Sequence, residues 1–412
     1  MNVLIIGKVW PEPQSSAAGS RMLQLIELFQ HQGWDITFAS AASKSKYSTS
    51  LESINIDSVT IRLNDPSFDQ FIEDLKPDLV LFDRYMTEEQ FGWRVAESCP
   101  NAIRILDTED LHGLREGRNI ALKEGRSFHQ SDLLNSISLR EIASVFRCDL
   151  SLIISESEME LLEGFYKIDL SLVHYIPFMI NSLTYLDIKE WKGFEEREHF
   201  VWIGNFLHEP NLDAVQYLKK EIWPVIRKQL PKAELHIYGA YPKEKVFQLN
   251  NEKEGFLVKG RASTVESIFS NSRILLAPIR FGAGLKGKCI EAMQYGLPSV
   301  TTKIGAEGIP GELPWPGAIA DSAEQIIKEA IALYTSSTEW DNAQAKGVEI
   351  LYKRFDKQKH GSVLIQRIEK LRDELTQHRT NNFVGAMLQH QSMSSTKFMG
   401  KWIEEKNRSK ES

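Results

Sequence analysis

The segment over residues 277–308 gathers glycines, basic residues and one carboxylate in an order that suits a phosphate-bearing ligand. It contains Gly282, Gly284 and Gly287, together with Arg280, Lys286 and Lys288. Glycines let the backbone approach an anion closely, and the free N–H groups at the start of a following helix attract negative charge. Three cations beside such a helix start suit a diphosphate.

Glu291 stands one turn into the predicted helix over residues 288–295. A carboxylate is badly placed there for a phosphate but well placed to accept hydrogen bonds from ribose hydroxyls. The segment therefore predicts a nucleoside diphosphate site with Glu291 on the nucleotide's sugar. It is no P-loop, because GxxxxGK[ST] is absent, and its GxGxxG spacing alone is weak evidence for a dehydrogenase. The alternative is a glycine loop that only turns the chain.

A second polar group lies in the loop over residues 105–118, which contains Asp107, Glu109, Asp110, His112, Arg115 and Arg118. Asp and His side chains can bind Mn²⁺ or Zn²⁺, so a metal site is one interpretation. The two arginines would repel a cation, and we therefore expect no metal here. A merely structural histidine is the other alternative.

Two more chain segments carry polar residues at the end of a predicted strand. Asp83 and Arg84 follow an apolar run and point into a ligand cleft if the sheet is parallel, although a structural ion pair explains them equally well. Gly19 and Arg21 stand where the predicted helix over residues 19–32 begins, and a simple helix-start glycine is the alternative there.

Short apolar runs alternate with longer amphipathic ones along the chain. We predict strands over residues 3–6, 35–39, 59–63, 78–82, 102–106, 150–154, 173–176, 199–203, 233–238, 256–259, 274–278, 299–302 and 318–320. Continuous Val, Ile and Leu runs are typical of strands buried on both faces. Their alternation with helices such as 212–228 predicts an α/β fold with parallel sheets. Two such series predict two doubly wound, Rossmann-like domains facing a cleft.

The charged segment over residues 181–198 interrupts this alternation and is predicted to be a linker. It separates a first domain (1–180) from a second (199–355), and a C-terminal helix and tail follow over residues 356–412. The tail carries Lys397, Lys401, Lys406, Arg408 and Lys410 beside Phe398, Met399 and Trp402. It is either a packed terminal helix with a frayed end or a surface that meets anionic lipid or a partner.

The composition excludes several classes of protein. The 412 residues carry a formal net charge of −7, which disfavours a nucleic-acid partner because phosphate binding needs concentrated Lys and Arg. The three cysteines form no CxxC pair, so we expect no structural zinc site. Reduced thiols in a cytosolic protein are the simplest interpretation. We find no signal peptide and no apolar stretch of the about 20 residues that span a bilayer. We expect a cytoplasmic protein, peripheral at the inner face of the membrane if its tail contacts lipid.

The run from Arg280 to Gly308 resembles the donor-binding segment of GT-B-fold retaining glycosyltransferases of the family 4 type, the glycosyl transferases group 1. Residues 148–162, 199–226 and 233–242 resemble other units of that family, so the resemblance covers nearly residues 1–355. It implies a GT-B fold, with the acceptor and part of the donor sugar on the first domain and the nucleotide sugar bound mainly by the second. It also implies no metal or other cofactor, because the nucleoside-diphosphate sugar is a donor substrate.

The resemblance further implies roles for single residues. Arg280 and Lys286 would neutralise the diphosphate, with Lys288 a weaker candidate, and His112 would hold the donor sugar at the reaction centre. The implied donor site also includes Gly19, Arg21, Asn205, Gly239, Gly284, Leu285 and Glu291. Many members carry a first glutamate that would fall at position 283, where this chain has Ala283. We interpret that departure as a subfamily variation.

The implied function is transfer of a sugar to a saccharide, lipid-linked or protein acceptor, with retention of configuration, in bacterial polysaccharide or glycoconjugate synthesis. Retention implies attack on the face that the leaving phosphate vacates. Two alternatives stay open: a nucleotide-sugar epimerase of the same fold, and a noncatalytic nucleotide-binding scaffold. Ala283 is the only support for the scaffold. An epimerase would convert the donor with no acceptor present.

Overall fold

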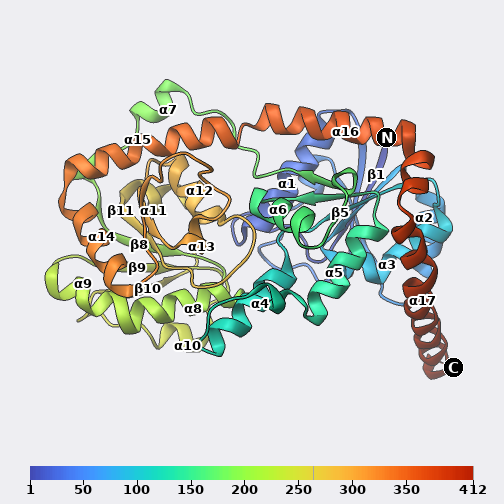
Figure 1. The fold of residues 1–412 in the computed structure, drawn as a ribbon, viewed down its shortest axis with the longest axis horizontal. Helices are drawn as coiled ribbons and strands as arrows, with labels where there is room; N and C mark the ends of the chain where they lie inside the picture. The colour runs from blue at the N-terminus through green and yellow to red at the C-terminus, as the bar shows by residue number, and fades with distance from the viewer. Residues whose placement is uncertain (263, 412) are drawn as a thin grey trace.

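The computed structural model describes residues 1–262 and 264–411 and contains two separate parallel sheets (Figure 1). The first has seven strands in the order β3-β2-β1-β4-β5-β6-β7. These are β1 (Asn2–Gly7), β2 (Asp35–Ser40), β3 (Asp57–Thr60), β4 (Leu79–Asp83), β5 (Ile103–Asp107), β6 (Leu150–Ile153) and β7 (Val173–Tyr175). Their connecting helices are α1 (Ala17–Gln30), α2 (Ser67–Leu75), α3 (Tyr85–Ser98), α4 (His112–Lys123), α5 (Ser136–Arg147) and α6 (Glu156–Gly164).

The second sheet has six strands in the order β10-β9-β8-β11-β12-β13. These are β8 (Glu198–Ile203), β9 (Leu235–Tyr238), β10 (Phe256–Gly260), β11 (Ser272–Ala277), β12 (Ser299–Thr301) and β13 (Gly317–Ile319). The helices after α7 (Tyr185–Lys189) are α8 (Glu209–Tyr217), α9 (Trp223–Gln229), α10 (Glu244–Phe247), α11 (Glu266–Asn271), α12 (Gly287–Gln294), α13 (Lys303–Ala306), α14 (Ala323–Thr335) and α15 (Ser337–Arg354). The predicted fold of two doubly wound α/β domains is confirmed.

Each sheet buries both of its faces, which explains the continuous apolar runs. In β1, Val3 and Ile5 belong to one hydrophobic cluster, whereas Leu4 belongs to the cluster on the other face. Successive side chains of a strand point to opposite faces, so a strand covered by helices on both sides must be apolar at every position. In β8, Phe200 and Val201 divide between two clusters in the same way.

The chain returns to the first domain after α15. The N–H of Ile180 donates to the carbonyl of Phe355 at 2.7 Å, so the two connections between the domains lie side by side. The predicted amphipathic helix forms α16 (Lys357–Asn381), which continues the line of α15 in Figure 1 and buries Leu364 and Ile368 in the first domain's core. Within residues 1–262 and 264–411, no helix is long and apolar enough to cross a membrane.

The predicted tail forms α17 (Phe383–Glu411), which packs against α3 and α5 of the first domain. Met393 is buried in this contact, and Arg94 of α3 forms an ion pair with Glu404. The far end of α17 projects beyond the domain in Figure 1. Ser412 and the side chain of Lys410, both in the predicted tail, lie outside the described part of the chain.

Candidate active site

A cleft of about 710 Å³ lies between the carboxyl ends of the two sheets. The strand order changes direction between β1 and β4 in the first sheet and between β8 and β11 in the second. Open α/β sheets bind ligands in the crevice at such a switch point. Lys8 and Arg84 follow β1 and β4, Asn205 and Ile279 follow β8 and β11, and all four line the cleft. The two crevices therefore open into one cavity.

The loop between β11 and α12 forms one wall of this cleft. Its predicted site residues Leu285 and Lys286 line the cavity, with Gly287 beside them. Gly284 lies behind this wall with φ +61, and its N–H donates to the carboxylate of Glu158 at 2.8 Å. A Cβ at position 284 would lie 2.8 Å from Cβ of Asp110, so this glycine permits the close approach of the two domains.

We expect Gly284→Ala to lower the melting temperature more than Gly125→Ala, and to weaken nucleotide binding as well. Both glycines have φ above +60, but a Cβ at Gly125 meets nothing within 4 Å. Both variants carry the same backbone strain, about 1–2 kcal/mol for alanine at positive φ. The clash with Asp110 adds about 1–3 kcal/mol at position 284 alone. Thermal denaturation and UDP titration of both variants measure the difference. Equal shifts in melting temperature would contradict the close approach.

Two lysines of this wall face the cleft. Lys286 is buried, and its Nζ donates to the carbonyls of Ala283 (3.3 Å) and Gly284 (2.9 Å). Burial lowers the pKa of Lys286, which Glu307 partly opposes. Lys288 donates to Asn211 Oδ1 at 2.8 Å, and burial lowers its pKa to about 7. These two cations are available where the sequence predicts a diphosphate.

Glu291 lines the cleft one turn into α12, as predicted for a contact with ribose. Burial raises its pKa to about 7, although the nearby charge of Lys288 lowers it. Its carboxylate makes no hydrogen bond with another described residue. Glu291 is therefore free to accept hydrogen bonds from a ligand.

The structure does not bring Arg280 into the cleft. Its guanidinium forms a two-pronged ion pair with Asp213 of α8, at 2.9 and 2.6 Å, and stacks over the ring of Tyr217. A guanidinium committed in this way does not reach a ligand on the cleft side of the loop. In this structure Lys286 and Lys288, rather than Arg280, are the cations positioned for the predicted diphosphate.

Gly19 and Arg21 also lie outside the cleft lining. Arg21 is fully buried, pairs with Asp107 at 3.0 Å and donates to the carbonyl of Ile176 at 2.6 Å. A Cβ at Gly19 would lie 2.5 Å from the backbone of Glu12. The absence of a side chain at Gly19 therefore lets the loop after β1 pack closely against the start of α1. Residues 15–18, at the start of α1, line the cleft instead and bring that helix's N-terminus to it.

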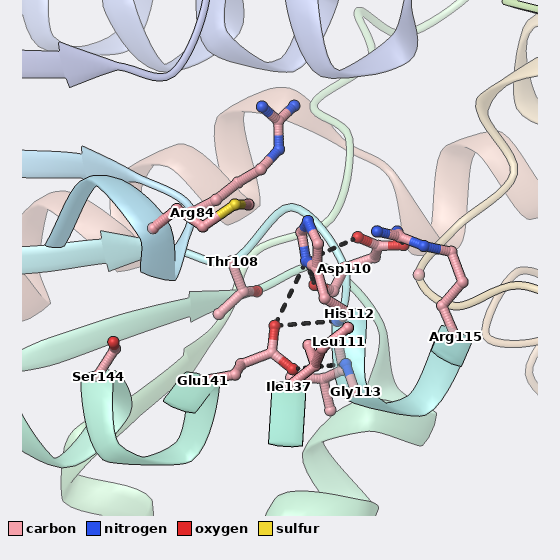
Figure 2. Close-up of polar contacts among 12 residues, drawn as sticks. Arg84, Thr108, Asp110, Leu111, His112, Gly113, Arg115, Ile137, Glu141 and Ser144 are labelled. Atoms are coloured by element: carbon pink, nitrogen blue, oxygen red, sulfur yellow. Dashed lines mark hydrogen bonds and ion pairs between the residues drawn. The ribbon is translucent and has the colours of Figure 1, made fainter. Parts of the chain in front are cut away.

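His112 begins α4 and lines the cleft, as predicted. Its Nδ1 lies 3.0 Å from the carbonyl of Asp110 and 3.4 Å from a carboxylate oxygen of Glu141, as the dashed lines of Figure 2 show. Glu141 also accepts the backbone N–H of His112 at 2.9 Å, which fixes the start of the helix. Because acceptors surround Nδ1, that nitrogen carries a proton, and Nε2 is left to form a hydrogen bond with a ligand's hydroxyl.

Asn205 and Gly239 line the cleft at the ends of β8 and β9. Asn205 Oδ1 accepts the N–H of Leu207 at 2.9 Å, which shapes the turn into α8. A Cβ at Gly239 would lie 2.1 Å from the carbonyl of Gly204, so only glycine fits between the two strand ends. The structure thus brings together six of the predicted site residues in one cavity: His112, Asn205, Gly239, Leu285, Lys286 and Glu291.

Polar contacts hold the two domains together across the cleft. Arg118 of α4 forms a two-pronged ion pair with Glu307, both bonds being 2.7 Å, and donates to the carbonyl of Gly282 at 2.8 Å. Glu158 accepts the N–H of Leu111 as well as that of Gly284. The glycine loop is thereby attached to the loop that carries His112.

Several cleft residues were missed by the sequence analysis. Lys8 and Arg261 line the cavity although neither belongs to a motif, and their only signal is that each follows a strand. Arg84, left open between a site residue and an ion pair, lines the cleft and contacts Asp83 at 3.5 Å. Glu109 lines it too, and burial with the charge of Asp107 raises the pKa of Glu109 to about 8.

Among the described residues, His199, Glu234 and His236 are the only group of three or more His, Cys, Asp or Glu side chains whose metal-binding atoms all lie within 4.8 Å of one another. This group lies at the starts of β8 and β9, at the opposite end of the sheet from the cleft. The Asp110 carboxylate, considered above as a metal ligand, pairs with Arg115 instead.

Comparisons with known proteins agree with this architecture. Residues 197–336 match the family model described as glycosyl transferases group 1. A sucrose-phosphate synthase from Thermosynechococcus elongatus is similar over 90% of this chain and 99% of its own, with 14% identity and a TM-score of 0.65. The Anabaena protein Alr3699/HepE, solved with UDP and glucose, shares 12% identity over the same fractions, also with a TM-score of 0.65.

WaaG, a glycosyltransferase involved in lipopolysaccharide biosynthesis, is similar over 88% of this chain and 99% of its own, with 11% identity and a TM-score of 0.59. A search of curated protein sequences gave no significant match. At these identities the structural matches show the fold alone, and the family model covers residues 197–336 within the second domain. The resemblance is thus confirmed at the level of the fold and of the second domain's match: the chain has the GT-B fold of glycosyltransferases, and residues 197–336 match the model of the glycosyl transferases group 1.

Proposed function

We propose that the protein transfers a sugar from a nucleoside-diphosphate sugar to a saccharide, lipid-linked or protein acceptor, with retention of configuration. Bacterial polysaccharide or glycoconjugate synthesis is the proposed setting. Family and fold support glycosyl transfer in general. The observation that carries the proposal is the wall of the cleft, where Lys286, Lys288 and Glu291 face one cavity in the order that a diphosphate and its ribose require.

The proposed reaction needs little covalent chemistry from the protein. The bond between the anomeric carbon and the diphosphate breaks, the acceptor oxygen bonds to that carbon on the same face, and the acceptor's proton passes to the leaving phosphate. Negative charge grows on the diphosphate while the sugar resembles an oxocarbenium ion. Lys286 and Lys288 lie where they can stabilise that charge, and His112 Nε2 can hold a sugar hydroxyl.

The surroundings of position 283 support a donor site that lacks the first glutamate of the family pattern. Ala283 lines the cleft while packing within a hydrophobic cluster of the first domain. A carboxylate there would be buried among apolar side chains, which is unfavourable without a partner. The donor sugar's hydroxyls are therefore proposed to bind to other groups, His112 among them.

Calorimetric titration with UDP and other nucleoside diphosphates tests the donor site, and the Anabaena relative solved with UDP makes UDP the first probe. Labelled nucleotide sugars, incubated with and without candidate acceptors, then test transfer. Failure to bind any nucleoside diphosphate would overturn the proposal in favour of a noncatalytic scaffold. An epimerised donor formed without an acceptor would instead identify an epimerase.

We also propose that α17 binds an anionic membrane surface, which would place this cytoplasmic enzyme at the inner face of the membrane. Phe398 and Trp402, one helical turn apart, have exposed fractions of 68% and 60%, and Met399 is exposed beside them. Lys401 and Lys406 are exposed on the same turns. Aromatic side chains that enter the headgroup region next to lysines are typical of membrane-surface helices.

We expect the double variant Lys401→Gln, Lys406→Gln to bind vesicles about 30-fold more weakly, since each lysine near an anionic surface contributes about 1 kcal/mol. Co-sedimentation with phosphatidylcholine vesicles, with and without phosphatidylglycerol, measures the binding. Trp402→Ser should also weaken it, whereas Phe383→Ser, exposed at the other end of α17, is the matched control. Equal binding to the two vesicle types would contradict the electrostatic contribution.

A further inference from the structure

Two cations border the switch point of the first sheet, on the side of the cleft away from the glycine loop. Lys8 directly follows β1, and Arg84 directly follows β4, the strand paired with β1. Both contact one oxygen of Asp83: the N–H of Lys8 at 3.0 Å and the guanidinium of Arg84 at 3.5 Å. The crevice between β1 and β4 thus has a positive residue on each side, and ligands of open α/β sheets bind in such a crevice.

The polar atoms of these two side chains are largely unused. Within the described residues, Lys8 Nζ contacts only Met86 Sδ, at 3.4 Å. A guanidinium offers five N–H donors, yet the contact with Asp83 is the only one recorded for Arg84 among those residues. Figure 2 shows the Arg84 side chain extended away from the strand. Its side chain is 16% exposed, so the unpaired nitrogens lie at the edge of the cleft, where a ligand can reach them.

The backbone at Arg84 is strained. Its φ of +69 and ψ of +157 lie in a region that is nearly restricted to glycine. An arginine persists there only when the surrounding structure holds it, and such outliers gather at ligand sites. The strained residue sits between β4 and α3, where it turns the chain into the helix at the edge of the cleft.

Neighbouring carboxylates compensate this pair of cations only in part. Burial opposes the charge of Arg84, but Asp83, which contacts it at 3.5 Å, helps to raise the pKa of Arg84. Asp83 accepts the backbone N–H of Lys8, and Asp110 pairs with Arg115. Glu109 has a pKa of about 8, raised by burial and by Asp107, so it is mostly neutral at pH 7. The pKa of Lys8 is lowered by burial and by the charge of Arg84, and Asp83 opposes this only in part. An anion between the two cations would relieve the remaining repulsion.

We propose that Lys8 and Arg84 bind a negatively charged group of the acceptor, a phosphate or a carboxylate, next to the hydroxyl that receives the sugar. This inference rests on the proposed function, because it places the donor's diphosphate against the second domain and the acceptor in the crevice between β1 and β4 of the first. The donor's diphosphate has its own cations, Lys286 and Lys288, on the opposite wall. The acceptor is therefore an anionic molecule rather than a neutral sugar.

Three sugars of one skeleton test the proposal: glucose, glucose 6-phosphate and glucuronate, titrated into the full chain saturated with UDP. We expect at least one of the two anions to bind about tenfold more tightly than glucose, since charge-assisted hydrogen bonds strengthen binding by about that factor each. The double variant Lys8→Gln, Arg84→Gln should remove this preference and leave UDP affinity within about threefold. Arg62→Gln with Lys303→Gln, two exposed cations, is the charge-matched control.

Preference for the phosphate alone or for the carboxylate alone identifies which anion the acceptor carries. Equal binding of all three sugars, or an unchanged preference in the Lys8 and Arg84 variant, would overturn the proposal. So would a loss of UDP affinity larger than the loss of anion affinity, because the cations would then belong to the donor site. Absence of UDP binding by the unmodified chain would instead refute the proposed function, and the same titrations without UDP would still test the cation pair.

Discussion

Lys286→Ala should slow sugar transfer by about 10²–10³-fold while changing donor affinity much less. Nζ of Lys286 donates to two carbonyls of the glycine loop, so one of its three N–H bonds is left for the ligand. These contacts fix the ammonium before the reaction begins. A charge held in place stabilises the leaving diphosphate more as its negative charge grows, and such differential binding lowers the barrier to transfer. Single-turnover kinetics with a donor and a working acceptor measure the rate.

Two further variants separate the charge of Lys286 from its packing. Lys286→Met keeps an unbranched side chain in the buried position and removes only the charge, so we expect nearly the same loss of rate. Arg280→Ala should slow transfer less than about tenfold, because Arg280 is paired with Asp213 outside the cleft. A large loss in Arg280→Ala, with a near-normal rate in Lys286→Met, would reverse this assignment and favour the roles expected from the sequence.

The elements of the fold were predictable because burial on both faces leaves a strong local signal. The expected strands at 3–6 and 274–278 correspond to β1 and β11 within a few residues. The strand expected over residues 59–63 lies two to three residues beyond the edge strand β3, which spans Asp57–Thr60. The residues of β3 are only partly buried, and Leu63, the last apolar residue of the expected strand, is 45% exposed. The helix expected over residues 212–228 contains a π turn at Leu218–Ile222, just before Pro224, which lacks the N–H of a regular helix.

The donor wall was predictable because its parts lie in one short segment. Lys286 and Glu291 are positioned by the strand, loop and helix that contain them, so their order in the sequence is their order in the cleft. Arg280 belongs to the same segment, but its direction is decided by Asp213, which is distant in sequence. No local pattern shows which of the neighbouring cations a remote carboxylate will neutralise.

The opposite wall could not be predicted because strand order, which periodicity does not encode, assembles it. Lys8 and Arg84 are 76 positions apart in the sequence. They become neighbours because β1 pairs with β4 on one side, in addition to β2, the next strand in the chain, on the other. His112 was expected from resemblance. The proton position on its ring depends on Glu141, a residue of the following helix. A sequence therefore indicates which polar residues stand at strand ends more readily than it predicts which of them lie side by side in the fold.

Glu291→Ala should weaken UDP binding by about 10²-fold at pH 8. A carboxylate that accepts two ribose hydroxyls makes two charge-assisted hydrogen bonds, and their loss costs about 3 kcal/mol in total. Glu266→Ala is the matched control, since it removes a carboxylate from the exposed rim of the same cleft. We expect that control to change UDP affinity less than about threefold. Calorimetry at constant ionic strength measures both dissociation constants, and similar losses in the two variants would remove Glu291 from the ribose site.

The pH dependence of UDP binding distinguishes a ribose contact from a loss of packing. Burial raises the pKa of Glu291 to about 7 in the free protein, and ribose hydroxyls favour its ionised form. The Glu291 contribution to affinity is therefore present above pH 7 and is lost as the pH falls, by up to about tenfold per pH unit. Lys288, whose pKa is also about 7, acts oppositely, because it loses its charge as the pH rises. The ratio of dissociation constants between Glu291→Gln and the unmodified chain cancels the titration of UDP itself. That ratio should increase from about pH 6 to pH 8, and a ratio independent of pH would show that the carboxylate makes no charged contact with the nucleotide.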